Sequence, residues 1–337
     1  MDEATAEARS QPDSGELMWH YTTLEALDAI LTSNSLMATE VSYLNDISET
    51  QTADDAFDTA LDQLSDAHPS FVVNARQVMA VLDDGGPFRG GEEQRLLAKA
   101  RFILCASDDG DSLYAWRTYG DCAIGLDPHG PLGLITEANH RSADVHQWVP
   151  VEYDEDVLRA GILDELRTHA ESWDGASTDD SSWDGGSTRF HIEWMELPPT
   201  RSRLRARAKN ASFADEREHR VTIEPNDLKG IFTTPSGMGP RPRVRLRSAH
   251  EWGAGISQSA PAPNLPIRAI RLGPGASDST IDGLRWMLLS HGYSIDAGAI
   301  EAGTYAAPEG REALPAYEDD WSETVIVSRS ARPYRRL

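Results

Sequence analysis

The sequence predicts an α+β fold in which short mixed or antiparallel strands surround a cleft and a block of helices is inserted after the first strand. Short apolar runs of strand length recur along the whole chain. They do not alternate regularly with helices, as the strands of a parallel βαβ sheet would. A long stretch of helical periodicity, about residues 47–100, separates the first polar cluster from the next strand.

The length of 337 residues allows one large domain or two smaller ones. We expect a disordered tail over residues 1–15 and a single α+β domain over 16–337. Within it, the polar sequence Ser-Trp-Asp-Gly occurs at Ser172–Gly175 and again at Ser182–Gly185. Because the surrounding residues are rich in Gly, Ser and Asp, residues 172–188 are interpreted as a mobile polar insertion.

The first element is a short apolar run that ends in His20-Tyr21-Thr22. The next residues resemble a helix capping box, with Thr22 as the cap and Glu25 three positions later. Apolar residues then recur at helical spacing to about Leu31. A histidine at the end of a strand can address a ligand, although a half-buried histidine bonded to the backbone is an equally good interpretation.

The remaining elements follow from the same periodicities. Helices are expected over 47–66, 70–82, 93–100, 157–171 and 279–291. Strands are expected over 102–105, 122–126, 148–154, 218–223, 241–247, 267–272 and 324–328.

The amino-acid composition limits the kinds of partner that the protein is expected to bind. The net charge is −24, divided into −28 for residues 1–200 and +4 for residues 201–337. This acidity disfavours bulk nucleic-acid binding but leaves room for a local arginine-lined phosphate pocket. No apolar run is long enough for a membrane span, and the polar N-terminus does not resemble a signal peptide. Cys105 and Cys122 have no metal-ligand spacing, so we expect no metal site and a cytoplasmic location.

The most suggestive carboxylates are Glu216 and Glu218. Residues two apart on a strand share one face, so both could enter one cleft with pKa values pushed apart. The alternative is an ordinary surface cluster, with Arg217 and Arg220 as partners. Motifs for a serine hydrolase, a zinc protease, a phosphate-binding loop or a dinucleotide fold are absent from the sequence.

Several polar clusters keep a fixed order along the chain. They are His20-Tyr21-Thr22, Tyr43-x-Asn45-Asp46-x-x-Glu49, Ser107…Asp111-Ser112-Leu113-x-x-Trp116-Arg117-x-Tyr119-Gly120, Ile124-Gly125-Leu126, Val151-x-Tyr153-Asp154, Phe213-x-x-Glu216-x-Glu218-x-Arg220, Ile270-x-x-Gly273-Pro274 and Ser330-x-x-Pro333-Tyr334-Arg335. Together they resemble the bacterial family called domain of unknown function 2971, over about residues 17–335. More distantly, the arrangement is similar to ADP-ribosyltransferases.

The second resemblance implies a nucleotide site that takes NAD as its substrate. It implies that His20 binds the ribose, that Tyr43 or Tyr119 stacks on nicotinamide, and that Glu218 stabilises the ribosyl cation, with Glu216 as the other catalytic candidate. The other residues expected at the nucleotide are Tyr21, Thr22, Asn45, Asp46, Trp116, Arg117 and Arg220. We therefore expect His20, Tyr43, Asn45, Asp46, Trp116, Arg117 and Glu218 to converge on one cleft.

The function expected from this resemblance is an ADP-ribosyltransferase-like enzyme, a toxin or phage-defence effector that modifies protein or nucleic acid. One alternative is a non-catalytic nucleotide or nucleic-acid sensor that uses Trp116, Arg117 and the basic segment 201–247. Another is a nucleic-acid glycosylase, which would also require a carboxylate and stacking aromatics.

Overall fold

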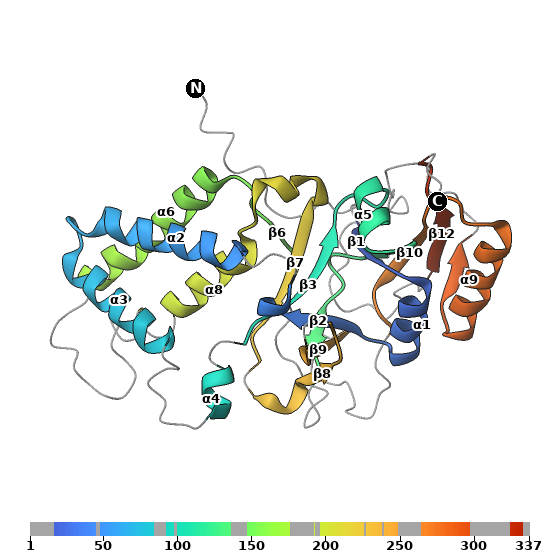
Figure 1. Cartoon of the computed structure of the whole chain (residues 1–337), viewed down its shortest axis with the longest axis horizontal. Helices are drawn as coiled ribbons and strands as arrows, with labels where there is room; N and C mark the ends of the chain where they lie inside the picture. Colours follow the sequence, from blue (N-terminus) through green and yellow to red (C-terminus); the bar gives the residue numbers. More distant parts are fainter. Residues whose placement is uncertain are drawn as a thin grey trace.

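The structure is a computed structural model of the chain. It describes residues 17–44, 48–83, 92–97, 100–135, 147–175, 192, 196–225, 227–237, 239–248, 264–296 and 324–332. Figure 1 shows a group of helices at one end of the molecule and a sheet that runs through the middle to the other end. The predicted α+β class is confirmed.

A twisted, mixed sheet of twelve strands forms the framework. Its strands are β1 (Met18–Thr22), β2 (Leu36–Glu40), β3 (Phe102–Ser107), β4 (Cys122–Leu126), β5 (Leu132–Leu134), β6 (Val149–Pro150), β7 (Glu218–Ile223), β8 (Phe232–Thr234), β9 (Arg241–Ser248), β10 (Ile267–Leu272), β11 (Ser294–Asp296) and β12 (Thr324–Arg329). The main path runs β11-β12-β10-β4-β1-β3-β2-β9-β5. Pairing is parallel within β10–β12–β11 and antiparallel in the other described pairs.

The sheet forks at β3. One edge of β3 pairs with β1 near its end, at Ser107, and with β2 near its start, at Phe102 and Ile103. The opposite edge pairs with β7 along its whole length. The middle of β3, around Cys105, therefore pairs with β7 on one edge. On its other edge lies the place where β1 and β2 diverge, which is called the fork below.

The two faces of the sheet differ. One face carries the main apolar core, on which α1 (Leu24–Ser33) and α9 (Asp278–Ser290) pack through residues such as Leu27 and Leu288. On the other face, α5 (Leu113–Thr118) covers β1 through Trp116, which lies against Tyr21 and shares a buried cluster with Trp19.

The helical group has its own apolar core. It contains α2 (Ser48–Leu64), α3 (Pro69–Asp83), α6 (Glu155–Gly175) and α8 (Leu197–Arg207), which pack through Phe57, Leu61, Phe71, Leu166 and Leu204 among others (Figure 1). Helices from distant parts of the chain therefore form one unit. The predicted helical insertion follows the second strand, not the first, because Leu36–Glu40 pairs with both β3 and β9. The short α4 (Glu92–Leu97) comes after α3.

Two local expectations need correction. The N-cap of α1 is Thr23, whose hydroxyl accepts a hydrogen bond from the amide of Ala26; Thr22 is instead the last residue of β1. Residues 172–175 are not part of a polar insertion, since they complete α6. Trp173 is buried there, with its ring 6.3 Å from that of Phe71.

Some of the predicted features involve residues that the structure does not describe. Residues 1–16 and 176–191, including Trp183, lie outside the described residues, as do Asn45 and Asp46. Among the described helices, none is both long and apolar enough to cross a membrane.

Candidate functional site

The site is built around Lys209, which joins the two candidate carboxylates. Its ammonium donates hydrogen bonds to Glu216 Oε2 and to Glu218 Oε2, both at 2.5 Å. All three side chains are almost completely buried. The two carboxylates meet at a lysine, which the sequence-based expectation of a shared cleft did not include.

Glu218 is held by a second cation. The Arg220 guanidinium donates to it through Nε at 2.8 Å and Nη2 at 3.1 Å, and its Nη1 donates to the carbonyl of Ala206. Burial alone would raise the pKa of Glu218, but Arg220 and Lys209 outweigh burial and lower it to about 2. Glu218 is therefore ionised at neutral pH, and Lys209, whose pKa its two carboxylates raise despite burial, remains protonated.

Glu216 lies at the outer side of the cluster. Its Oε1 accepts a hydrogen bond from the Tyr119 hydroxyl at 3.0 Å. The rings of Tyr119 and Tyr114 meet edge to face, 6.5 Å apart, and both residues are about 40% exposed, at 41% and 40%. Two solvent-facing aromatic rings thus stand beside Glu216, whereas Glu218 lies behind it.

The backbone explains how the carboxylates meet. Glu216 ends the 3₁₀ turn η4 (Ala211–Glu216), Arg217 adopts a left-handed conformation with φ 47°, and Glu218 begins β7. Ser107 supports this corner, because its hydroxyl donates to the Glu216 carbonyl at 2.7 Å. The Tyr153 hydroxyl accepts from the Glu218 amide at 2.8 Å. The pair converges through a turn, not through the regular alternation of a strand.

Tyr21 and Trp116 were both predicted to bind the nucleotide. In the structure their side chains make hydrogen bonds and packing contacts within the fold. The Tyr21 hydroxyl donates to the carbonyl of Asp109 at 2.6 Å and accepts from the amide of Ser112 at 2.9 Å. Its ring packs edge to face on Trp116, 4.7 Å away, and Trp116 Nε1 donates to Asp111. These buried contacts tie the loop before α5 to β1.

Gly120, the residue after Tyr119, packs closely against the backbone of β1. Its φ is +145°, and a Cβ atom there would lie 2.2 Å from the carbonyl oxygen of Thr22. Thr22 therefore contributes its backbone to this close approach, and we assign it no ligand contact. Only glycine lets the chain leave α5 in this direction.

His20 lies at the fork of the sheet. Its Nδ1 donates to the Cys105 carbonyl at 2.8 Å, because a carbonyl can only accept. Burial lowers the pKa of His20, and the bond to Cys105 opposes this only in part. The neutral ring then keeps Nε2 as an acceptor.

The strand register places His20 and Glu218 on opposite faces of the sheet. Trp19 is opposite Ser107, and Ser107 is opposite Glu218, so these three share one face while His20 points to the other. Cys105 lies between the two, with its carbonyl on His20 and its thiol on Glu218. The expectation that His20 and Glu218 enter one open cleft is therefore wrong.

Tyr43 is also far from the carboxylates. It ends η2 (Val41–Tyr43), beyond the Phe102 end of β3, while Glu218 pairs with Ser107 at the other end. The length of β3 alone separates these ends by about 17 Å. Of the two tyrosines proposed to stack on nicotinamide, Tyr119 is the one beside the carboxylates.

Arg117, another residue predicted at the nucleotide, lies on α5 with its side chain exposed.

Of the predicted residues, the structure brings together Glu216, Glu218, Tyr119 and Arg220. The residues that the sequence analysis missed are Lys209, Tyr114, Tyr153, Cys105 and Ser107. One signal was present for Lys209, which is one of only three lysines in a chain rich in arginine. A lone lysine just before two glutamates is a candidate partner for them.

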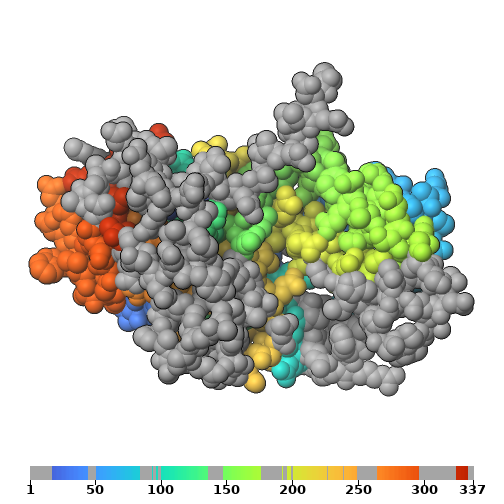
Figure 2. All heavy atoms as spheres, turned by 180° about the vertical axis from the view of Figure 1, so that it is seen from behind, coloured from blue at the N-terminus to red at the C-terminus, as the bar shows by residue number. Residues whose placement is uncertain are grey.

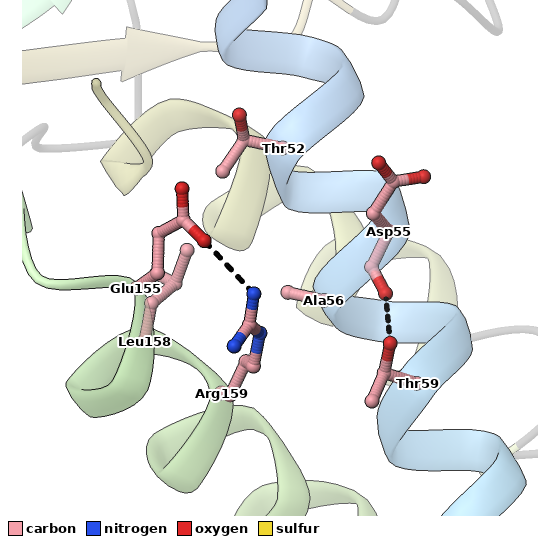
Figure 3. Close-up of a pocket in the computed structure, with 7 residues that line it drawn as sticks. All are labelled: Thr52, Asp55, Ala56, Thr59, Glu155, Leu158 and Arg159. Atoms are coloured by element: carbon pink, nitrogen blue, oxygen red, sulfur yellow. Dashed lines mark hydrogen bonds and ion pairs between the residues drawn. The ribbon is translucent and has the colours of Figure 1, made fainter.

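A pocket between α2 and α6 shares no lining residue with this cluster (Figure 3). Two of its polar side chains have partners within the pocket: Arg159 pairs with Glu155 at 2.8 Å, and the Thr59 hydroxyl donates to the carbonyl of Asp55. Within the described ranges, no group of three or more histidine, cysteine or acidic residues could hold a metal ion.

The chain was compared with known proteins in three ways. No family model matches it, and neither does a curated protein or a solved structure. The resemblances drawn from its motifs therefore stay predictions.

Proposed function

We propose that the protein is an ADP-ribosyltransferase-like enzyme that cleaves the N-glycosidic bond of NAD at the Glu216–Lys209–Glu218 cluster. The observation that carries the proposal is this pair of carboxylates on one ammonium, with the exposed rings of Tyr114 and Tyr119 beside Glu216. Protein or nucleic acid would accept the ADP-ribosyl group. A toxin or phage-defence role remains a prediction.

The chemistry requires a fixed negative charge. When the bond between the ribose C1′ and the nicotinamide nitrogen breaks, the electron pair goes to nicotinamide, and positive charge develops on the ribose. Glu216, the carboxylate at the outer side, would stabilise this cation. An acceptor hydroxyl or water would then attack C1′ and lose its proton to solvent.

The protonation states favour NAD over a nucleic-acid base. Nicotinamide leaves NAD as a neutral molecule without taking up a proton, whereas a neutral nucleobase leaves more readily when an acid protonates it. Glu218 is held ionised, and the pKa of Lys209 is raised. Burial and Glu216 likewise raise the pKa of Tyr119. These groups are poor proton donors at neutral pH, so the cluster suits a leaving group that needs none.

The roles of the other residues follow from their positions. Tyr119 and Tyr114 would stack on the nicotinamide ring and exclude water, in the role first assigned to Tyr43 or Tyr119. Lys209 and Arg220 would keep the carboxylates ionised and oriented. In this proposal His20 supports the fork and makes no substrate contact.

Nicotinamide release from NAD tests the proposal, with candidate protein and nucleic-acid acceptors present. Glu216→Gln should lower kcat by about 10²–10³-fold, because the amide keeps the size of the side chain but loses its charge. Tyr119→Phe should keep most activity, and Tyr119→Ala should raise KM. The matched control is Glu165→Gln on α6, where the carboxylate pairs with Arg203 away from the cluster.

Two outcomes would overturn the proposal. One is wild-type protein that releases no nicotinamide above the buffer background with any acceptor. If that protein still bound NAD, the non-catalytic nucleotide sensor would replace the enzyme. The other is a Glu216→Gln variant as active as the Glu165→Gln control.

A further inference from the structure

One face of β9 carries a row of four arginines: Arg241, Arg243, Arg245 and Arg247. They alternate with Val244 and Leu246, which are buried in the main core. Because side chains alternate along a strand, the four guanidinium groups leave the same face at intervals of about 7 Å. The strand therefore carries a regular row of positive charge on one face.

These arginines have no carboxylate partner among the described residues. Elsewhere in this part of the chain, Arg201 and Arg205 bind Asp54, Arg203 binds Glu165, and Arg220 binds Glu218. The contacts of the row are weaker: Arg245 lies over the ring of Phe232, and Arg247 donates to the Ser33 carbonyl at 3.3 Å. In a chain of net charge −24, a row of four cations without a carboxylate partner in the described ranges is unexpected.

Buried hydrogen-bonding groups without partners gather at the same place. Of six such side-chain atoms in the described residues, four belong to β8 and β9: Thr234 Oγ1 and the Nε atoms of Arg241, Arg243 and Arg247. Thr234 is directly opposite Arg241. A buried donor without an acceptor is destabilising, so these groups would gain hydrogen bonds from a ligand that supplies acceptor oxygens. Burial and the neighbouring Arg241 also lower the pKa of Arg243, as expected where no anion is near.

We propose that the arginine row of β9 binds the phosphate backbone of a single-stranded nucleic acid. Guanidinium groups bind phosphate through paired N–H donors, and a regular line of cations fits an anion that repeats regularly. The guanidinium carbon of Arg245 lies 4.7 Å from the centroid of the Phe232 ring, and Arg245 is exposed, so a base could stack beside this pair. Figure 2 shows part of the β8–β9 segment, in yellow to gold, at the surface of the molecule.

The row also has a defined position relative to the carboxylates. Arg243 pairs with Thr39, Thr39 with Ile103, and Ile103 with Thr222. Residues directly opposite one another share a face, so the row lies on the same face as Glu218. Arg243 is three strands, or about 14 Å, from Thr222, and Glu218 lies four residues, or about 13 Å, farther along β7. The binding proposal itself does not depend on the proposed reaction with NAD.

Fluorescence anisotropy with labelled DNA and RNA single strands of about 12 nucleotides tests the proposal. If four phosphates are bound, log K should fall with log salt with a slope of about −3, a loss of about fifty-fold between 50 and 200 mM salt. The double variant Arg241→Gln/Arg245→Gln should bind more weakly and lose about half of that slope. Its control, Arg159→Gln/Arg203→Gln, removes two exposed arginines of the helical group and should behave like wild type.

Three results would overturn the proposal: no binding at the lowest salt, equal salt slopes for the β9 variant and its control, or equal affinity for a duplex or for inorganic polyphosphate. The last would show a general polyanion surface instead of one for single strands. Circular dichroism of each variant verifies that it is folded. These outcomes are separate from the nicotinamide assay, which can fail while the oligonucleotide still binds.

Discussion

Arg220 follows Glu218 by two residues on β7, and its buried guanidinium holds the Glu218 carboxylate through two N–H groups, at 2.8 and 3.1 Å. With Lys209 and Glu216, the pair forms a network of two cations and two carboxylates. Such a network is stable only when complete, because each charge has lost its water. Its parts are therefore coupled in stability as well as in any chemistry.

Glu218→Gln should destabilise the protein by about 3–5 kcal/mol, because two buried cations lose a shared carboxylate. Urea unfolding of wild type and variant measures this difference. Glu165→Gln, which breaks an exposed pair, should cost no more than about 1 kcal/mol. A cost below 1 kcal/mol for Glu218→Gln would show that the network is not closed in solution. Loss of activity in this variant would not by itself identify Glu218 as catalytic.

Gly120→Ala should cost about 2 kcal/mol or more, because φ is +145° and the new methyl group would meet the Thr22 carbonyl. It should also move Tyr119 away from Glu216. Gly283→Ala on α9 is the matched control, since a methyl group there meets nothing within 4 Å. That change should stabilise the helix by about 0.5–1 kcal/mol. Thermal unfolding measures both effects. Equal midpoints for the two variants would contradict the steric role of Gly120.

Trp173→Ala should cost about 3–5 kcal/mol, because the indole is buried against Phe71 within the core of the helical group. Trp286→Ala on α9 provides the comparison, because that indole is 75% exposed and its removal should change stability by less than about 0.5 kcal/mol. Urea midpoints of the two variants give the difference. A neutral Trp173→Ala would restore the sequence-based prediction of a loose polar loop at residues 172–175.

His20 should make the protein less stable in mild acid. Burial lowers its pKa in the folded state, so below the unfolded pKa of 6.5 the unfolded chain binds a proton that the folded chain does not. The free energy of unfolding should then fall as the pH drops below 6.5, by up to about 1.4 kcal/mol per pH unit. His20→Asn keeps a donor near the position of Nδ1 and removes this dependence.

The experiment is urea unfolding between pH 7.5 and pH 5. This range lies above the window of Glu218, whose contribution is lost only as the pH falls from 4.5 towards 2. Equal slopes for wild type and His20→Asn would show that His20 is not held neutral at the fork.

The sequence by itself determined the elements whose hydrophobic pattern is local. The helices at α1, α6 and α9 and the strands at β4, β7, β9 and β10 follow from periodicity over their own residues, because burying one face requires an apolar residue at a fixed interval. By contrast, α8 has no apolar stripe to reveal it. Its arginines alternate in sequence, and it is held by ion pairs to α2 and α6, such as Arg205 with Asp54 and Arg203 with Glu165.

The tertiary structure decided the candidate site. Glu216 and Glu218 were recognisable from their spacing, but Lys209 reaches them only because Arg217 turns the chain and Glu152 pairs with Ala208. Whether His20 shares a face with Glu218 depends on the register of β1 against β3, two strands that are 85 residues apart at the His20–Cys105 contact. No local pattern encodes such a register, because it is set by the packing of side chains that are distant in the sequence and meet only in the folded sheet.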